Sequence, residues 1–400
     1  MASLSLRPQA CPEQGRGGAP LLRILSVFMI GLAMAGCVPR SRPAPPPPTP
    51  EVVPEAQRPN GRLPADETRN RVAVLVPLSG SNAALGQSLL NAANLALLDT
   101  GGQRIRITAY DTARGAAAAA NEAVADGNGL FLGPVLAEDV RAVAGIARAE
   151  EIPVISFSND VSVAGDGVYV IGVNPAQSID RVVSFAVSRG VRRFGGLTPT
   201  GTYGQRAGQA LTVAISGARG SLVGMESYSR TAADMRAAAA RLNGRGAYDA
   251  VLLADGAQIA LQLATTVRQA SPQPRLFGTE LWASETNLSA NVALRGSWFA
   301  APTDGNYGAF RTRYRARYNS APFRLASMGY DAVLLTVRIA ADWPIGRRFP
   351  ARSLRESTGF AGVDGAFRFR RDGVAERALE VREVGATGTT VVSPAPRGFE

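Results

Sequence analysis

The chain has 400 residues, of which 46% are hydrophobic and 19% are charged, so it is long enough for roughly two domains with hydrophobic cores. It has no histidine, and all 43 of its basic residues are arginine. Such a chain cannot form a Ser-His-Asp triad, a histidine metal site, a Schiff base or a lysine-containing P-loop. Its two cysteines, Cys11 and Cys37, also exclude an iron–sulfur cluster or zinc ribbon. Any remaining enzyme chemistry would have to rest on carboxylates, hydroxyls and arginine. We expect no metal and no cofactor, and we assign no catalytic residue.

Residues 1–36 have the pattern of a signal peptide. Three arginines precede an apolar run, Ile24 to Ala35, which ends in small residues. The following Leu32-Ala33-Met34-Ala35-Gly36-Cys37 is similar to a bacterial lipobox, although Met34 is unusual at its place. An uncut membrane anchor is the alternative, but twelve apolar residues are too few for a span that needs about twenty. We expect Cys37 to be lipidated and the protein to be periplasmic, tethered to the cell membrane or the outer membrane.

Residues 37–70 are interpreted as the lipidated cysteine and a proline-rich linker. Ten prolines lie between Pro39 and Pro64, with few large apolar residues among them. Such a segment is a semi-rigid spacer that holds a folded part away from the membrane. A disordered tail would have much the same consequence.

Strands and helices alternate from Arg71 onwards. Val72 to Val76 is apolar on both faces, which is typical of a covered parallel strand. The next segment repeats apolar residues with helical spacing. Further strands are predicted at 105–110, 129–133 and 152–156, and helices at 116–126 and 138–150. Repeated βα units predict a doubly wound α/β lobe.

A second, similar series follows Asn174-Pro175. One more strand is predicted before it, at 169–173, and the second series has strands at 193–197, 221–226, 249–254 and 275–278, with helices ending at Ser188 and starting at Tyr203. Two more helices are expected at 305–319 and 324–341, and a pair of strands at 365–369 and 379–384. Gly362-Val363-Asp364-Gly365 and Asp372-Gly373 indicate turns between short strands.

These segments together resemble the leucine-binding family of type I periplasmic solute-binding proteins. The resemblance rests on Val74-Leu75-Val76-Pro77-Leu78-Ser79-Gly80 with Gly86, on Gly133-Pro134, on Ile152 to Ser156, on Tyr203-Gly204 and on Gly329 to Ala332. It implies an α/β fold with two Rossmann-like lobes, parallel sheets and an interlobe cleft that clamps a ligand. The chain would cross between lobes near Val173, Ala300 and Gly346. We expect residues 71–173 with 302–345 in the first lobe, 174–301 with 346–385 in the second, and 386–400 as a tail.

Ligands of open α/β sheets bind beyond the carboxyl ends of the strands, near helix N-termini. In the first lobe this selects Ser79, Gly80 and Ser81, which could grip a carboxylate or could only cap a helix. Ala137 stands where the family resemblance implies a ligand-binding Ser or Thr. Ser158 and Asp160 follow the next strand, and Asp160 replaces a Thr of the family, so it would favour an ammonium group.

The second lobe supplies three further candidates. The resemblance implies that the ring of Tyr203 covers the ligand, but an aromatic residue at a helix start is as often ordinary packing. Asp255 and Glu280 each follow a strand, and an acidic residue of this lobe neutralises the α-ammonium in the family's amino-acid binders. Asp255 could equally only cap a helix.

The helix at 305–319 carries Tyr307, Phe310, Tyr314 and Tyr318 on one face, which indicates core packing. Its arginines would form a solvated face that could meet an acidic partner. The formal charge of +11 allows nucleic acid, but the export signal and the absence of an aromatic-plus-basic sheet motif argue against it.

Three functions remain open. The first is a non-enzymatic, lipid-anchored binding protein that closes over a small polar, amino-acid-like solute and passes it to an ABC permease. The second follows from a narrower resemblance to lipoproteins that activate penicillin-binding proteins, and its partner would be a peptidoglycan synthase. The third is a hydrolase that uses the two carboxylates of Asp160 and Asp255, as glycosidases do.

Overall fold

The structure is a computed structural model that describes residues 66, 68–270, 273–285 and 287–399. Its first lobe is built on a parallel sheet with the strand order β2-β1-β3-β4-β5. The strands are β1 (Asn70–Val76), β2 (Ile105–Asp111), β3 (Leu130–Leu132), β4 (Val154–Ser156) and β5 (Val168–Val170). All pairs in this sheet are parallel, as the uninterrupted apolar run of β1 predicts.

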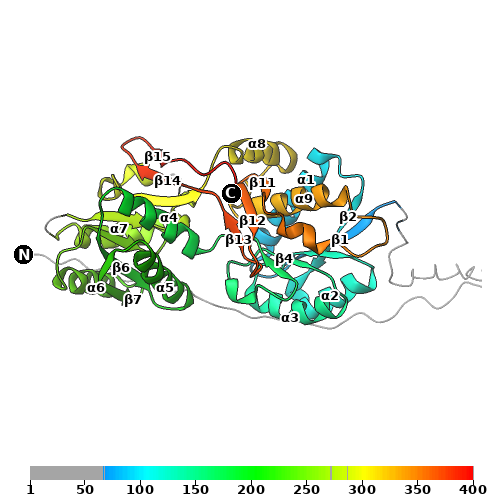
Figure 1. Ribbon diagram of the computed structural model, residues 1–400, viewed down its shortest axis with the longest axis horizontal. Coiled ribbons are helices and arrows are strands. Elements are labelled where there is room, and N and C mark those ends of the chain that lie inside the picture. Colours follow the sequence, from blue (N-terminus) through cyan, green and yellow to red (C-terminus); the bar gives the residue numbers. More distant parts are fainter. Residues whose placement is uncertain (1–65, 67, 271–272, 286, 400) are drawn as a thin grey trace, which may run out of the picture. The chain divides into compact units, whose positions relative to one another are not determined.

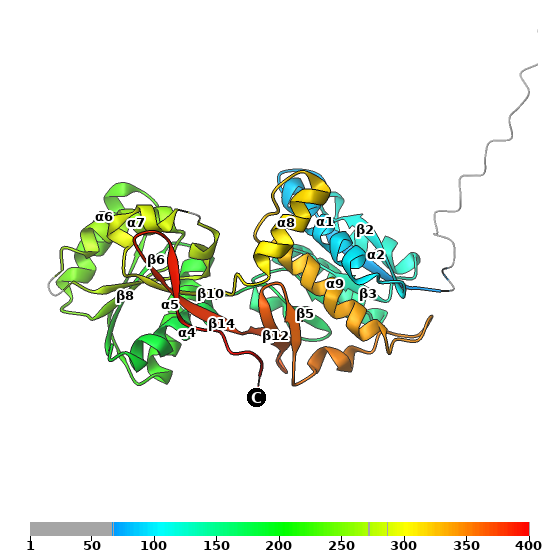
Figure 2. The same ribbon diagram turned by 90° about the horizontal axis from the view of Figure 1, so that it is seen from above.

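Helices cover both faces of the first sheet. On one face lie α1 (Ala83–Thr100), α8 (Tyr307–Tyr318) and α9 (Ala326–Ala340). Figure 2 shows the three helices close together, although some two hundred residues separate α1 from the other two. On the other face lie α2 (Ala116–Ala125) and α3 (Ala137–Ala149). Strand β1 alternates between the two cores: Val72 and Val74 pack towards α1 and α9, and Ala73 and Leu75 towards α2 and α3.

The second lobe repeats the same plan. Five parallel strands run in the order β7-β6-β8-β9-β10, the same order as in the first sheet, and β14 and β15 extend the sheet beyond β10 as antiparallel strands. The strands are β6 (Arg193–Pro199), β7 (Ser221–Tyr228), β8 (Ala250–Leu253), β9 (Arg275–Gly278), β10 (Trp298–Pro302), β14 (Leu379–Val384) and β15 (Thr389–Ser393). The expected two-lobed α/β fold is therefore confirmed, with a mixed second sheet.

Two pairs of helices enclose this sheet, as a comparison of Figure 1 with Figure 2 shows. The pair α4 (Pro175–Ser188) and α5 (Thr202–Gly217) packs on one face, against alternate side chains such as Phe194 and Leu252. The pair α6 (Ala232–Gly244) and α7 (Ala257–Val267) packs on the other, against Leu253 and Leu276. The period-two pattern of each strand thus supplies both cores.

A third, antiparallel sheet differs from the sequence expectation. It contains β11 (Phe360–Gly362), β12 (Gly365–Phe369) and β13 (Ala375–Arg377). Its side chains, together with Phe349 and Leu354, join the core beneath α1 and α9 in the first lobe. Residues 346–375 thus pack with the first lobe rather than with the second, and the chain enters the second sheet only between Arg377 and Leu379. The large aromatic residues of this segment determine with which lobe it packs, and the turn signals in the sequence do not predict that packing.

The remaining expectations have simpler outcomes. Strand β15 lies within the segment expected as a tail and pairs with β14. On α8, Phe310 and Tyr314 are buried and Tyr307 and Tyr318 pack at the edge of the same core, which confirms the aromatic face. No helix in the described ranges is long and apolar enough to span a bilayer. The signal peptide, Cys37 and most of the linker lie outside those ranges.

Candidate ligand-binding site

A cavity of about 280 Å³ lies where loops of both lobes meet. Leu136 after β3 and Phe157 after β4 line it from the first lobe, and the short 3₁₀ helix η3 (Glu280–Ser284) lines it from the second. Gly172 and Pro302, at two of the passages between the lobes, also contribute to its wall. The cavity is therefore at the carboxyl ends of the strands, where an open α/β sheet binds ligands, and its volume suits a small molecule.

Glu280 brings a carboxylate with spare hydrogen-bonding capacity to this cavity. Its Oε1 accepts a hydrogen bond from the Tyr203 hydroxyl at 3.2 Å, while its Oε2 is buried and has no partner among the described residues. Burial raises the pKa of Glu280 to about 7, against the hydrogen bond from Tyr203, which lowers it. A cationic or hydrogen-bond-donating ligand would satisfy Oε2, and a cation would also favour the ionised carboxylate.

Tyr203 supports this carboxylate rather than covering the cavity as the resemblance implies. Its hydroxyl lies 3.0 Å from Thr279 Oγ1 as well as near Glu280, and it does not line the cavity. Burial and the neighbouring carboxylate raise the pKa of Tyr203 well above its ordinary value, so its hydroxyl keeps its proton and remains a donor. Tyr203 and Glu280 are two candidates that the structure brings together.

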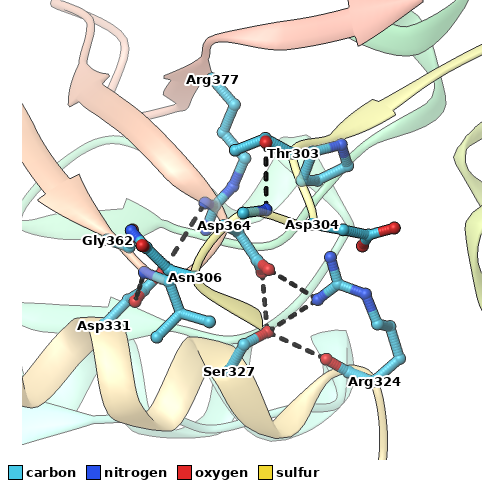
Figure 3. A network of polar contacts seen from close by, with 12 residues as sticks. Thr303, Asp304, Asn306, Arg324, Ser327, Asp331, Gly362, Asp364 and Arg377 are labelled. Atoms are coloured by element: carbon cyan, nitrogen blue, oxygen red, sulfur yellow. Dashed lines mark hydrogen bonds and ion pairs between the residues drawn. The ribbon is translucent and has the colours of Figure 1, made fainter. Parts of the chain in front are cut away.

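A polar network of the first lobe also lines the cavity (Figure 3). Arg324 Nη1 donates to Asp364 Oδ1 at 2.6 Å and to Ser327 Oγ at 3.1 Å, and Ser327 Oγ donates to Asp364 Oδ2 at 2.7 Å. All three residues line the cavity. The second terminal nitrogen of Arg324, Nη2, is buried without a hydrogen-bond partner in the described chain.

A second buried ion pair lies behind this network. Asp331 Oδ1 accepts a hydrogen bond from the Val363 amide at 2.6 Å, and its Oδ2 lies 3.9 Å from Arg377 Nη1 (Figure 3). Burial and the nearby Asp364 raise the pKa of Asp331, while Arg377 opposes that effect. Arg377 also donates to the Ile171 carbonyl at 2.9 Å, close to the first passage between the lobes. This pair ties the third sheet to the region where the chain crosses.

The candidates after β1 are directed elsewhere. Ser79 Oγ donates to Asp111 Oδ2 at 2.7 Å, which joins the ends of β1 and β2. Gly80 adopts a positive φ of 71°, and both Gly80 and Ser81 are exposed. The described cavity wall includes none of these three residues.

The candidates after β3 and β4 lie beside the cavity but not on it. Ala137 is the first residue of α3, directly after the lining residue Leu136. Ser158 is buried, and its Oγ accepts a hydrogen bond from the Asp160 amide at 3.1 Å. Neither side chain is on the cavity wall.

Asp160 is already neutralised by two arginines. Arg141 of its own lobe lies 3.1 Å from Oδ2, and Arg206 of α5 in the second lobe lies 2.8 Å from Oδ1. Burial alone would raise the pKa of Asp160, but hydrogen bonds from Ser162 and Arg206 lower it to about 2. Asp160 therefore links the lobes, on the side of a larger groove of about 840 Å³ whose wall includes Ser162 and Arg206.

Asp255 is likewise paired. Arg230 holds both of its oxygens, at 2.8 and 3.2 Å, and the Tyr228 hydroxyl lies 3.2 Å from Oδ2. Gly256, which precedes α7, donates its amide to Oδ1 at 2.9 Å. Because arginines already occupy the carboxylates of Asp160 and Asp255, neither is positioned as a free acid or base for hydrolysis.

Arg324, Ser327 and Asp364 are not among the ligand-binding residues predicted from the sequence. Arg324 and Asp364 are 40 residues apart, and no sequence motif connects them. Only the turn signal at Gly362-Val363-Asp364-Gly365 marked this region, and it gave no sign that the turn would carry a carboxylate to the cavity.

Comparison with known proteins adds the following matches. An uncharacterised protein, RP748, of Rickettsia prowazekii is 27% identical over 142 residues, which cover 35% of this chain and only 38% of that relative. A putative branched-chain amino acid ABC transporter protein from Rhodospirillum rubrum has a similar fold, with a TM-score of 0.71 and 21% identity over 81% of this chain and 100% of the other. The C-domain of LpoA from Haemophilus influenzae, a regulator of PBP1A, gives a TM-score of 0.64 and 18% identity over 81% of this chain and 100% of that domain.

A family model also matches residues 70–389, and that range contains the first sheet, the second sheet apart from most of β15, the cavity and every candidate ligand-binding residue. The two solved structures each share the fold over 81% of the chain, although their low identities say nothing about a common ligand. The chain belongs to the periplasmic binding protein family.

Proposed function

We propose that the protein is a non-enzymatic, lipid-anchored binding protein of the periplasm that closes its two lobes over a small polar, amino-acid-like solute. The observation that carries this proposal is the cavity between the lobes, which Glu280 lines and near which the buried Oε2 of Glu280 has no partner in the described chain. A ligand that contacts both lobes stabilises the closed arrangement, because only differential affinity can shift a conformational equilibrium. In an uptake system the closed form would then be presented to an ABC permease.

A thermal-shift screen against amino acids, small organic acids and peptidoglycan fragments tests this function. A ligand at one hundred times its dissociation constant adds about 2.7 kcal/mol to the free energy of unfolding, which is a readily measured rise in melting temperature. A rise with an amino acid that is lost in Glu280→Ala supports solute binding at this cavity. Absence of a rise with every small solute contradicts it.

A second function, activation of a penicillin-binding protein in peptidoglycan synthesis, has its own support. The fold is similar to the LpoA C-domain, and the carboxylates of Asp160 and Asp255, two of the expected ligand contacts, are instead held by arginines. The proline-rich segment expected at residues 37–70 also favours this function, because a solute receptor needs only a short tether. Direct binding of the purified protein to a peptidoglycan synthase, with an increased rate of glycan polymerisation, would favour this function over solute uptake.

A further inference from the structure

The guanidinium group of Arg324 has one terminal nitrogen held by hydrogen bonds and the other without a partner in the described chain. Asp364 and Ser327 together hold Nη1, and the Arg324 guanidinium carbon lies 4.1 Å from the centre of the Tyr307 ring. The side chain is only 18% exposed. A buried guanidinium group that is restrained in this way cannot easily rotate to become hydrated. Its geometry is therefore preorganised to bind a hydrogen-bond acceptor.

The unsatisfied nitrogen is energetically costly. A buried donor without a partner loses its hydration and gains nothing in return, and the loss is larger for a charged group than for a neutral one. Burial lowers the pKa of Arg324, but the charge of Asp364 more than offsets this and keeps the guanidinium protonated. An acceptor supplied by a ligand would recover the lost interaction, most effectively if the acceptor were an anion.

The charges around the cavity define which anion fits. The Asp364 carboxylate is 2% exposed and is used by Arg324 and Ser327, so it is not free to bind a ligand. Glu280, which lines the same cavity from the second lobe, offers an acceptor instead. A ligand that contacts both therefore needs a negative group at one end and a donor or positive group at the other.

We propose that Arg324 is the anion-binding residue of this cavity and that it binds the carboxylate of the solute through Nη2. This inference rests on the proposed function for the identity of the natural ligand. It assigns the carboxylate to the start of α9 rather than to the loops after β1 and β3, where Ser79 is occupied by Asp111 and Ala137 has no hydroxyl. The solute then spans the lobes, with its anionic end on the first and its donor end on Glu280.

Acetate tests this site without knowledge of the natural ligand. The Nε–Hε signal of Arg324 is assigned by NMR from its loss in Arg324→Lys, and the protein is then titrated with acetate to tens of millimolar. We expect a saturable shift of that signal and a matching rise in melting temperature. Both effects should be absent in Arg324→Gln and retained in Arg315→Gln, a control that removes an exposed arginine of α8.

Arg324→Gln leaves Asp364 without its cation and could therefore unfold, whereas Arg324→Lys keeps a positive charge beside Asp364 and provides a folded variant. Lysine presents a single ammonium group rather than a fork, so the acetate effect on melting temperature should fall at least fivefold. Methylammonium, which lacks a carboxylate, should leave the Arg324 signal unchanged.

The possible failures are distinguishable. If acetate does not shift the Arg324 signal, or raises the melting temperature of both Arg324 variants as much as that of the wild type, the inference is overturned. If acetate binds at Arg324 but no amino acid stabilises the protein, the anion site stands and the proposed solute uptake fails. If an amino acid and its decarboxylated amine bind equally well to the wild type, solute binding stands and the role of Arg324 is refuted.

Discussion

Replacing Glu280 with glutamine should change how stability depends on pH. The folded protein raises the pKa of Glu280 from its ordinary 4.5 to about 7, because the carboxylate is buried. Its neutral form is therefore favoured in the folded state, and the related stability is fully present below pH 4.5 and is lost as the pH rises through about 7. The corresponding free energy is about 3 kcal/mol at most, since each pKa unit is worth about 1.4 kcal/mol.

Glutamine resembles the protonated acid and cannot ionise. Glu280→Gln and the wild type should thus have similar unfolding free energies near pH 4.5, and the variant should be more stable by about 1–3 kcal/mol at about pH 8. Denaturant unfolding of both proteins at the two pH values measures this difference, and comparison of the two cancels the contribution of Asp331, whose pKa is also raised. An equal difference at both pH values would refute a raised pKa at Glu280.

Three further predictions concern the packing and the contact between the lobes. Gly86→Ala places a Cβ atom 1.8 Å from the Pro77 carbonyl oxygen and should destabilise the protein by about 3 kcal/mol or more. Gly145→Ala, at an exposed helical site with no atom within 4 Å, should stabilise it by about 0.5–1 kcal/mol. Melting curves that rank the two variants in the other order would contradict the close packing of α1 against the end of β1. Asp160→Asn should lower the free energy of unfolding by about 1 kcal/mol at neutral pH. The difference from the wild type should shrink as the pH falls from 3.8 towards about 2, because the lowered pKa of Asp160 means that its stabilising charge is lost in that range. A difference in unfolding free energy that does not depend on pH would exclude this explanation. Arg206→Gln should lower the free energy of unfolding by less than about 1 kcal/mol, because the Arg206 side chain is 35% exposed. If the ion pair of Arg206 with Asp160 stabilises the unliganded arrangement of the lobes, the same variant should bind solute more tightly. Weaker binding by calorimetry would show that the ion pair belongs to the liganded state instead.

Much of the fold could be predicted because its signals are local. The apolar run of β1, the helical spacing after it and the repetition of both in the second half of the chain predict two doubly wound lobes. Gly86 and Gly204 mark the same feature in each lobe: a Cβ atom would lie 1.8 Å from the Pro77 oxygen at the first and 1.7 Å from the Pro199 oxygen at the second. Each helix approaches the end of its strand so closely that no side chain fits at this position. Glycine therefore stands at both sites, and both glycines are among the residues that carry the family resemblance.

The third sheet and the polar site were harder to predict because they depend on distant contacts. Phe360 and Phe367 form a short hairpin whose partner, the core under α9, could not be inferred from local pattern. In the same way, the availability of a carboxylate depends on whether an arginine from another segment already binds it. Asp160 and Asp255 are equal to Glu280 as sequence candidates, yet only Glu280 keeps an oxygen without a partner in the described chain.

The proposed function requires that a bound solute brings the lobes together. The only cysteines of the sequence, Cys11 and Cys37, precede the folded lobes, so in a chain with both replaced by serine new cysteines can be placed at exposed sites on α3 (Ala142) and α6 (Ala240) and spin-labelled. Pulsed electron–electron double resonance then measures the distance between the lobes, with a pair within the first lobe, Ala118 and Ala142, as the control. With the amino acid that stabilises the protein most, we expect a shorter and narrower distance distribution between the lobes and no change within the first. An interlobe distribution that does not change when the solute saturates the protein would contradict the account.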